Sequence, residues 1–189
     1  MRFFLTMAIL AMLPFMHGCA ALALGGAAAA GGYLVGEDRR AVNILAEDQA
    51  VELRIANRVS EKYPSAHINA TCYNKLVLLT GEAPNEAAKA DIEAIARGVP
   101  DVRSIVNELQ IGESTPFSAR ANDSYITSKV KARFLDARRF NPVHVKVVTE
   151  GATVYLLGIV TQKEGDDATE IARTTSGVQK VVRIFEPRT

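Results

Sequence analysis

The sequence is poor in the side chains that form disulfides and most metal sites, because its 189 residues include only two cysteines and three histidines. If Cys19, in the apolar N-terminal segment, is modified, Cys72 has no partner for an internal disulfide. Cys72 alternates with Ile68 and Ala70, as a small buried residue of a strand does. The chain also lacks an excess of charge, and a net charge of +1 excludes the strongly basic composition of general nucleic-acid binders. We therefore expect packed hydrophobic cores and no nucleic-acid partner.

The first 36 residues carry a single charge, on Arg2, and the apolar run from Phe3 to Phe15 leads into "MHGCAAL". Three interpretations are open. The Gly18–Cys19 bond can be cleaved and Cys19 lipidated, as in the bacterial lipobox that Gly18 and Cys19 resemble; the stretch can be an uncleaved membrane helix; or it can be cleaved to release a soluble protein. All three place the rest of the chain beyond the inner membrane.

We favour lipidation of Cys19, with palmitate among the attached fatty acids, because "GGAAAAGG" suits a flexible tether better than a membrane span. The sequence thus predicts a lipoprotein signal peptide over 1–18 and a lipidated cysteine with a Gly/Ala-rich tether over 19–46. Ala20 follows the cysteine, and no Asp stands where it would commonly retain a lipoprotein at the inner membrane. We therefore expect a lipid-anchored protein at the periplasmic face of the outer membrane.

The rest of the chain repeats itself. Two segments of the chain are similar in sequence, namely "KLVLLTGEAPNEAAKADIEAIARGVPDVRSIVNEL" and "ATVYLLGIVTQKEGDDATEIARTTSGVQKVVRIF". Gly81 matches Gly158 at an offset of 77, and "IAR" at 95–97 matches "IAR" at 171–173 at an offset of 76. Self-similarity of this extent indicates two copies of one structural unit. The two glycines are expected to have a structural role where the second strand of each copy leads toward a helix.

Each copy predicts the order α-β-β-α-β, in which a three-stranded mixed sheet is covered by two helices. The first helices are expected over Val51–Tyr63 and Ser124–Leu135, and the second helices over Asn85–Arg97 and Lys163–Thr175. Strand pairs are expected over Ile68–Cys72 with Leu76–Thr80 and Val143–Thr149 with Thr153–Leu157, turning at Asn74-Lys75 and Glu150-Gly151, and closing strands are centred on Val106 and Val182. We expect two separate α/β sandwiches, and a soluble fragment from Asp123 onward.

Two copies with a central "LLTG" or "YLLG", an "IAR" helix and a "GV" turn resemble two BON domains. Together with the lipobox-like cysteine, "EDRR" and "NDSYITSKV", they resemble the dual BON-domain outer-membrane lipoproteins of Gram-negative bacteria. The predicted boundaries are 47–111 for the first BON domain, 112–121 for a linker and 122–189 for the second BON domain. The resemblance implies that the second domain binds anionic phospholipid, chiefly phosphatidylglycerol, and that the protein supports envelope integrity and acts at the division site.

The first helix of the second copy contains the surface that we expect to bind phospholipid. On a helical wheel, Tyr125, Ser128, Ala132 and Leu135 form an outward stripe opposite the core positions Ile126, Val130 and Phe134. The predicted phospholipid-binding residues are this stripe and the cations around it, namely Tyr125, Ser128, Lys129, Lys131, Ala132, Arg133, Leu135, Arg138 and Arg139. Residues 123–139 have five basic and two acidic side chains, whereas residues 47–63 have three basic and four acidic. The alternative is a periplasmic scaffold whose stripe contacts another envelope or division-site protein or peptidoglycan.

Motifs of catalysis are missing. The sequence has no phosphate-binding loop, nucleophile elbow or zinc signature. His67 and His144 stand at equivalent positions before the first strand of each copy and are not at metal-ligand spacing, so a shared structural role is expected. The acidic run from Glu164 to Asp167 fits the first turn of a helix. We therefore expect no enzyme, no catalytic residue, no cofactor and no metal site.

Overall fold

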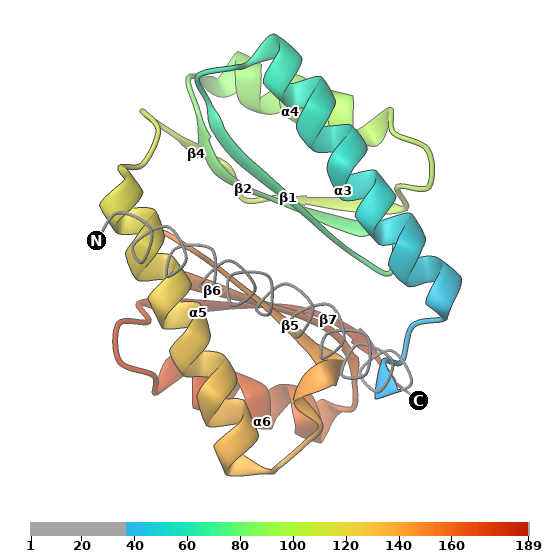
Figure 1. Cartoon of the computed structure of the whole chain (residues 1–189), viewed down its shortest axis with the longest axis vertical. Helices are drawn as coiled ribbons and strands as arrows, with labels where there is room; N and C mark the ends of the chain where they lie inside the picture. Colours follow the sequence, from blue (N-terminus) through green and yellow to red (C-terminus); the bar gives the residue numbers. More distant parts are fainter. Residues whose placement is uncertain (1–36, 189) are drawn as a thin grey trace, which may run out of the picture. The chain divides into compact units, whose positions relative to one another are not determined.

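The computed structural model describes residues 37–188, which form two α-β-β-α-β repeats (Figure 1). The first repeat consists of α3 (Val42–Lys62), β1 (His67–Tyr73), β2 (Leu76–Ala83), α4 (Glu86–Arg97) and β3 (Ser104–Asn107), followed by the short β4 (Gln110–Ile111). The second consists of α5 (Phe117–Ala137), the 3-10 helix η2 (Pro142–His144), β5 (Val145–Glu150), β6 (Thr153–Val160), α6 (Gln162–Arg173) and β7 (Lys180–Pro187). The predicted fold class is confirmed. The predicted signal peptide and Cys19 lie outside the described residues.

Both sheets have the same topology. β2 is central in the order β1-β2-β3, antiparallel to β1 and parallel to β3, and β6 is central in the same way between β5 and β7. Two helices cover one face of each sheet, α3 with α4 and α5 with α6 (Figure 1). Alternate residues of the central strands point under the helices, and Val77 and Leu79 of β2 therefore share one core with Ile55 and Ile92.

The first helix of each repeat is longer than predicted. α3 begins at Val42, inside the predicted tether, and α5 begins at Phe117, inside the predicted linker 112–121. Pro116, with φ −58° and ψ 150°, immediately precedes α5, and proline commonly occupies the start of a helix because it has no N–H to leave without a partner. The second helices agree closely with prediction, and Asn85 accepts a hydrogen bond from the Ala88 amide as the N-cap of α4.

The two hairpins turn through pairs of residues with positive φ. Asn74 and Lys75 have φ values of 51° and 65°, and Gly151 and Ala152 have φ values of 54° and 58°. A two-residue turn of this kind matches the twist of antiparallel strands. The second turn lies one residue later than the predicted Glu150-Gly151, because Glu150 still pairs with Thr153 at the end of β5.

Each turn is held by a buried aspartate of the helix above it. Asp48 of α3 accepts hydrogen bonds of 2.8 Å from the amides of both Asn74 and Lys75. Asp123 of α5 accepts bonds of 3.0 and 2.9 Å from the amides of Gly151 and Ala152. Two turn amides that cannot pair within their hairpin are thus satisfied by one carboxylate in each repeat.

Glu164, the first residue of the acidic run, lies in the first turn of α6 as predicted, whereas Asp166 and Asp167 follow in the second turn. Glu164 forms a capping box with Thr161, whose amide donates to the Glu164 carboxylate over 2.8 Å. Arg39 donates to both carboxylate oxygens, at 2.6 and 2.8 Å. These hydrogen bonds, those from Arg39 foremost, lower the pKa of Glu164 to about 2. The residues just before α3 are therefore tied to the second repeat.

The sheet faces that the helices leave uncovered contact each other. Tyr73 and Leu78 of the first repeat form a third hydrophobic cluster with Tyr155 and Leu157 of the second. Residues 39–189 are accordingly one compact unit, which differs from the expected pair of separate sandwiches. A fragment that starts at Asp123 would cut α5 and expose this cluster. A chain that starts at Glu37 keeps all three clusters and is therefore the appropriate form for experiments.

Cys72 lies inside the first core, as the sequence predicts, and its thiol is expected to be unreactive in the native protein. Its Sγ contacts Asp48 Oδ1 at 3.2 Å, and burial together with the Asp48 carboxylate raises the pKa of the thiol well above its usual range. Because the thiolate is the reactive species, the chain starting at Glu37 should react with a disulfide reagent at pH 7.5 at least about a hundredfold more slowly than the urea-unfolded chain. Equal rates would show that the α3–β1 region opens readily.

Candidate functional site

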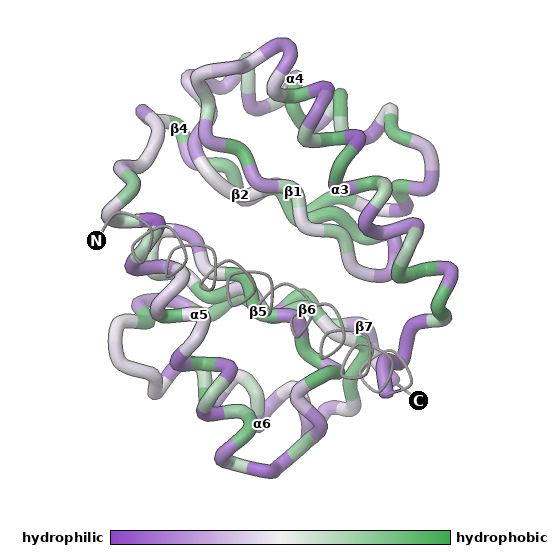
Figure 2. Tube along the Cα trace, viewed as in Figure 1, coloured by the Kyte–Doolittle hydropathy of each residue, from purple (hydrophilic) through white to green (hydrophobic). Residues whose placement is uncertain are grey.

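The inner face of α5 is anchored in the second core. Ile126, Val130 and Phe134 are buried, and the Phe134 ring packs edge-on against Phe140 with the ring centroids 5.0 Å apart. Hydrophobic and hydrophilic residues alternate along α5 (Figure 2). Because three successive turns of the helix are fixed against the sheet, the orientation of its opposite side is also fixed.

The predicted stripe lies on that opposite side. Tyr125 and Leu135 are 62% and 64% exposed, and Ser128 and Ala132 between them are exposed as well. Phe117, which was not predicted, is 79% exposed. Its position precedes Leu135 by five full turns at 3.6 residues per turn, so both side chains project from the same line of the helix. The outer stripe of α5 therefore consists of Phe117, Tyr125, Ser128, Ala132 and Leu135 and is about 27 Å long.

Three of the predicted cations are engaged in the fold. Lys129 Nζ donates to the Ser176 carbonyl and lies 4.6 Å from the centre of the Tyr125 ring. Arg133 donates to the Ile171 carbonyl at 2.9 Å and to the Thr175 hydroxyl at 2.8 Å, which ties α5 to the end of α6. Arg139 pairs with Asp167 over 3.4 Å. These three side chains are less available to a ligand than the sequence suggests.

Other cations on α5 and at its end remain accessible. Lys131 and Arg138 are exposed and form no hydrogen bond or ion pair through their side chains with any residue between 37 and 188. Arg120, which was not predicted, is also exposed, with its guanidinium 6.0 Å from the centre of the Phe117 ring. At 100° per residue, these three cations lie on the same side of the outer stripe. The helix thus presents an apolar line with a basic border.

The equivalent helix α3 differs in charge. It exposes Val42 and Leu53, so an apolar outer position is not unique to α5. However, Lys62 is paired with Asp91, Arg58 donates to the Gly98 carbonyl, and four acidic residues outnumber the three basic ones over 47–63. Only α5 combines an exposed aromatic line with unpaired cations among the described helices.

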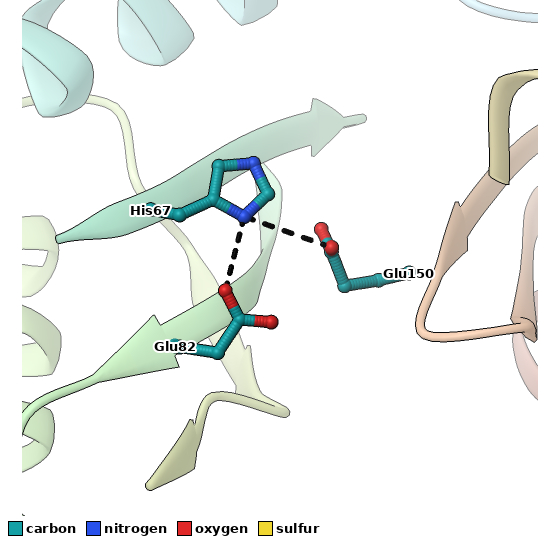
Figure 3. Close-up of side chains that lie close together, drawn as sticks. All are labelled: His67, Glu82 and Glu150. Carbon is teal, nitrogen blue, oxygen red and sulfur yellow. Dashed lines mark hydrogen bonds and ion pairs between the residues drawn. The ribbon is translucent and has the colours of Figure 1, made fainter. Parts of the chain in front are cut away.

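The structure also brings together three side chains that the sequence did not connect. His67 at the start of β1 lies between Glu82 of β2 and Glu150 of β5 (Figure 3). Its Nδ1 atom is 3.1 Å from a Glu82 oxygen and 3.8 Å from a Glu150 oxygen. Linear spacing could not reveal this group, because it depends on the pairing of β1 with β2 and on the contact between the repeats.

Charge and burial act differently on the two carboxyl groups. Burial, the largest influence, raises the pKa of Glu150, and Glu82 and Asp123 nearby add to this effect. Burial acts in the same direction on Glu82, but hydrogen bonds from Thr115 and His67 outweigh it and hold the pKa of Glu82 below its usual range. The group could hold a metal ion.

None of the helices between residues 37 and 188 is both long and apolar enough to cross a membrane.

Comparison with known proteins agrees with the repeat architecture. The BON domain model matches residues 47–113 and 122–185. The chain is 35% identical over 175 residues to the outer membrane lipoprotein DolP of Haemophilus influenzae, covering 91% of this chain and 90% of that protein. It is 33% identical over 151 residues to a 21 kDa hemolysin of Actinobacillus pleuropneumoniae, covering 78% of each. It is 28% identical over 155 residues to the osmotically-inducible protein Y of Escherichia coli, covering 79% of this chain and 77% of that protein. The chain therefore belongs to the family of dual BON-domain outer-membrane lipoproteins.

Proposed function

We propose that this protein is a non-enzymatic lipoprotein of the outer membrane that binds anionic phospholipid, chiefly phosphatidylglycerol, through the outer stripe of α5. The observation that carries the proposal is the exposure of Phe117, Tyr125 and Leu135 on one side of a helix, beside accessible cations. An apolar line with a basic border is the pattern of a helix that lies in the interface of a bilayer.

The physical basis is the combination of burial and charge. The backbone groups of α5 are paired within the helix, so its outer side can enter the headgroup region at little cost in unpaired polar groups. Transfer of aromatic and leucine side chains out of water lowers the free energy of the bound state. Each basic residue near an anionic surface strengthens binding by about 1 kcal/mol more. Arg120, Lys131 and Arg138 are placed to make the second contribution.

A lipid on Cys19 would complement this surface. A single acyl anchor and a weak interfacial helix each give limited membrane affinity, whereas two signals on one chain give stable attachment. The anchor would hold the second BON domain at the periplasmic face of the outer membrane, where its contact with phospholipid becomes effectively intramolecular. The name of the Haemophilus influenzae relative, an outer membrane lipoprotein, supports this location. A role in envelope integrity and at the division site is proposed on the same family resemblance.

The proposal predicts that apolar truncation of the outer stripe weakens vesicle binding. In the chain starting at Glu37, combined replacement of Phe117, Tyr125 and Leu135 with alanine should reduce the partition coefficient into phosphatidylglycerol vesicles at least about thirtyfold. The reason is that three apolar side chains that would be partly buried in the bilayer interface are removed. Arg120→Glu with Lys131→Glu should reduce it by a similar factor at low salt and less at high salt. Vesicle co-sedimentation with phosphatidylglycerol and phosphatidylcholine measures both effects.

The matched control is Leu53→Ala, which removes an equally exposed leucine from α3 and should leave binding unchanged. Circular dichroism checks that every variant is folded. Equal binding to both lipids, or full binding by both sets of α5 variants, would contradict the proposal. In that case the stripe is better explained as a contact for another envelope protein or for peptidoglycan, and the protein as a periplasmic scaffold.

A further inference from the structure

We propose that His67, Glu82 and Glu150 form a divalent metal site, best suited to Zn²⁺, that joins the first BON domain to the second. The three side chains come from β1, β2 and β5, so an ion at this point would be bound by both repeats (Figure 3). The site is distinct from the outer stripe of α5, and it revises the expectation that the protein has no metal ligands.

The spacing of the ligand atoms fits a small ion. One oxygen from each carboxylate and one histidine nitrogen lie within 4.8 Å of one another. In a tetrahedral zinc site with bonds of about 2.0 Å, the ligand atoms are about 3.3 Å apart. The observed separations of 3.1 Å from His67 Nδ1 to Glu82 and 3.8 Å from His67 Nδ1 to Glu150 lie on either side of that value. Small side-chain rotations would therefore suffice to bind the ion.

The chemistry of the three ligands favours zinc. One imidazole and two carboxylates are ligands that Zn²⁺ accepts, with a water molecule in the fourth position, whereas Ca²⁺ and Mg²⁺ prefer six or more oxygen ligands. The side chains of His67, Glu82 and Glu150 are only 14%, 14% and 10% exposed. The site is thus reachable by an ion and largely shielded from competing water.

Neighbouring groups already orient the ligands. Thr115 donates to Glu82 through its backbone amide at 3.0 Å and through its hydroxyl. Asn69 donates to Glu150 at 2.9 Å and lies 3.2 Å from Nε2 of His67. Hydrogen bonds of this kind around a metal site fix the direction of its ligands and increase its affinity.

A dication would also offset an unfavourable concentration of negative charge. Two largely buried carboxylates approach the same imidazole, and His67 is the only potentially cationic side chain between residues 37 and 188 that lies within ion-pair distance of either. Without metal, the Nδ1–H of His67 can donate to Glu82 while Nε2 accepts from Asn69. Binding of the ion at Nδ1 would require the proton of the neutral imidazole to move to Nε2, and the Asn69 amide would then have to turn its oxygen toward Nε2 to accept it.

The second repeat provides an internal comparison. His144 occupies the position equivalent to His67, but the positions equivalent to Glu82 and Glu150, at the offset of 77, are Ile159 and Tyr73. The histidine therefore belongs to the repeat, whereas the two carboxylates are found at only one of the two sites. Both carboxylates are consequently not required by the BON fold itself, which is the situation expected of a ligand site.

The test is calorimetric titration of the untagged, chelator-treated chain starting at Glu37 with Zn²⁺ at pH 7.5. We expect one ion per chain, a rise in the melting temperature with Zn²⁺, and a visible absorption spectrum of low-symmetry type with Co²⁺. Glu150→Gln and His67→Gln should each weaken binding at least about tenfold, while His144→Gln should bind as the native chain does.

Glu150→Gln also tests whether the ion joins the repeats, because it leaves His67 and Glu82 in the first repeat intact. In this variant the rise in melting temperature with Zn²⁺ should be clearly smaller than in the native chain at the same Zn²⁺ concentration. The proposal would be overturned by absence of saturable binding to the native chain, by binding that Glu150→Gln and His67→Gln leave unchanged, or by an equal loss in His144→Gln. Circular dichroism of each variant without metal separates loss of a ligand from loss of the fold.

Discussion

Replacing Gly81 with alanine should lower the free energy of unfolding by at least about 4 kcal/mol, which is an exceptional cost for the addition of one methyl group. Gly81 lies in β2 opposite Ile68 of β1, with φ at 108°. A Cβ atom at this position would lie 1.9 Å from the carbonyl oxygen of His67. Backbone conformation and space both exclude a side chain, so β1 would have to separate from β2 at this point.

Two other glycines separate these contributions. Gly151 has φ at 54° but no neighbour within 4 Å, so Gly151→Ala should cost about 1 kcal/mol from the backbone alone. Gly112 has neither a positive φ nor a neighbour within that distance, and Gly112→Ala should change stability by less than about 0.5 kcal/mol. Urea unfolding of the three variants without metal measures all three values. A cost for Gly81→Ala no larger than that for Gly151→Ala would show that the strands do not approach so closely.

Replacing Asp123 with alanine should lower the free energy of unfolding by about 3 kcal/mol. The carboxylate is buried and accepts hydrogen bonds from the amides of Gly151 and Ala152. Its removal leaves two amides of the β5–β6 turn without their partner, and each unpaired buried amide costs about 1–3 kcal/mol. Glu150 immediately precedes this turn, so zinc affinity should decline as well. Thermal or urea unfolding in the absence of metal measures the stability change.

The control for Asp123→Ala is Asp136→Ala, which removes an exposed carboxylate from the same helix and should change stability by less than about 0.5 kcal/mol. Asp123→Asn should give an intermediate loss, because its amide oxygen can accept only part of what the carboxylate accepts. If Asp123→Ala and Asp136→Ala were equally stable, the turn amides would have to be satisfied by water, and the aspartate would not hold the hairpin.

The fold was largely predictable because the sequence contains two copies of the same structural unit. Each copy supports the interpretation of the other, so the order of the elements followed from short hydrophobic patterns. Gly81 and Gly158 were expected where the second strands lead toward the helices, but both lie inside strands, in β2 and β6. The starts of α3 and α5 were not predicted, because their first turns have few core residues. Asp48 and Asp123 were also missed, since a helix sequence does not reveal that a turn lies beneath it.

The candidate site was predictable only in part, for a similar reason. The exposure of Tyr125 and Leu135 follows from helical periodicity, which is a local property. The hydrogen bonds of Arg133 to α6 and the approach of Glu150 to His67 depend on tertiary contacts between segments distant in sequence. Phe117 was missed because the helix was expected to begin later.

The contact between the uncovered sheet faces has a consequence for how such a chain can diverge. Leu78 and Tyr155 are equivalent residues, as are Val106 and Val182, and all four lie in the shared cluster. A single repeat would have to cover this surface by forming a homodimer, in which every substitution appears twice. Joining the two copies in one polypeptide removes that constraint. One copy can then acquire a basic helix, or donate a lone carboxylate across the contact, while the other keeps a different surface.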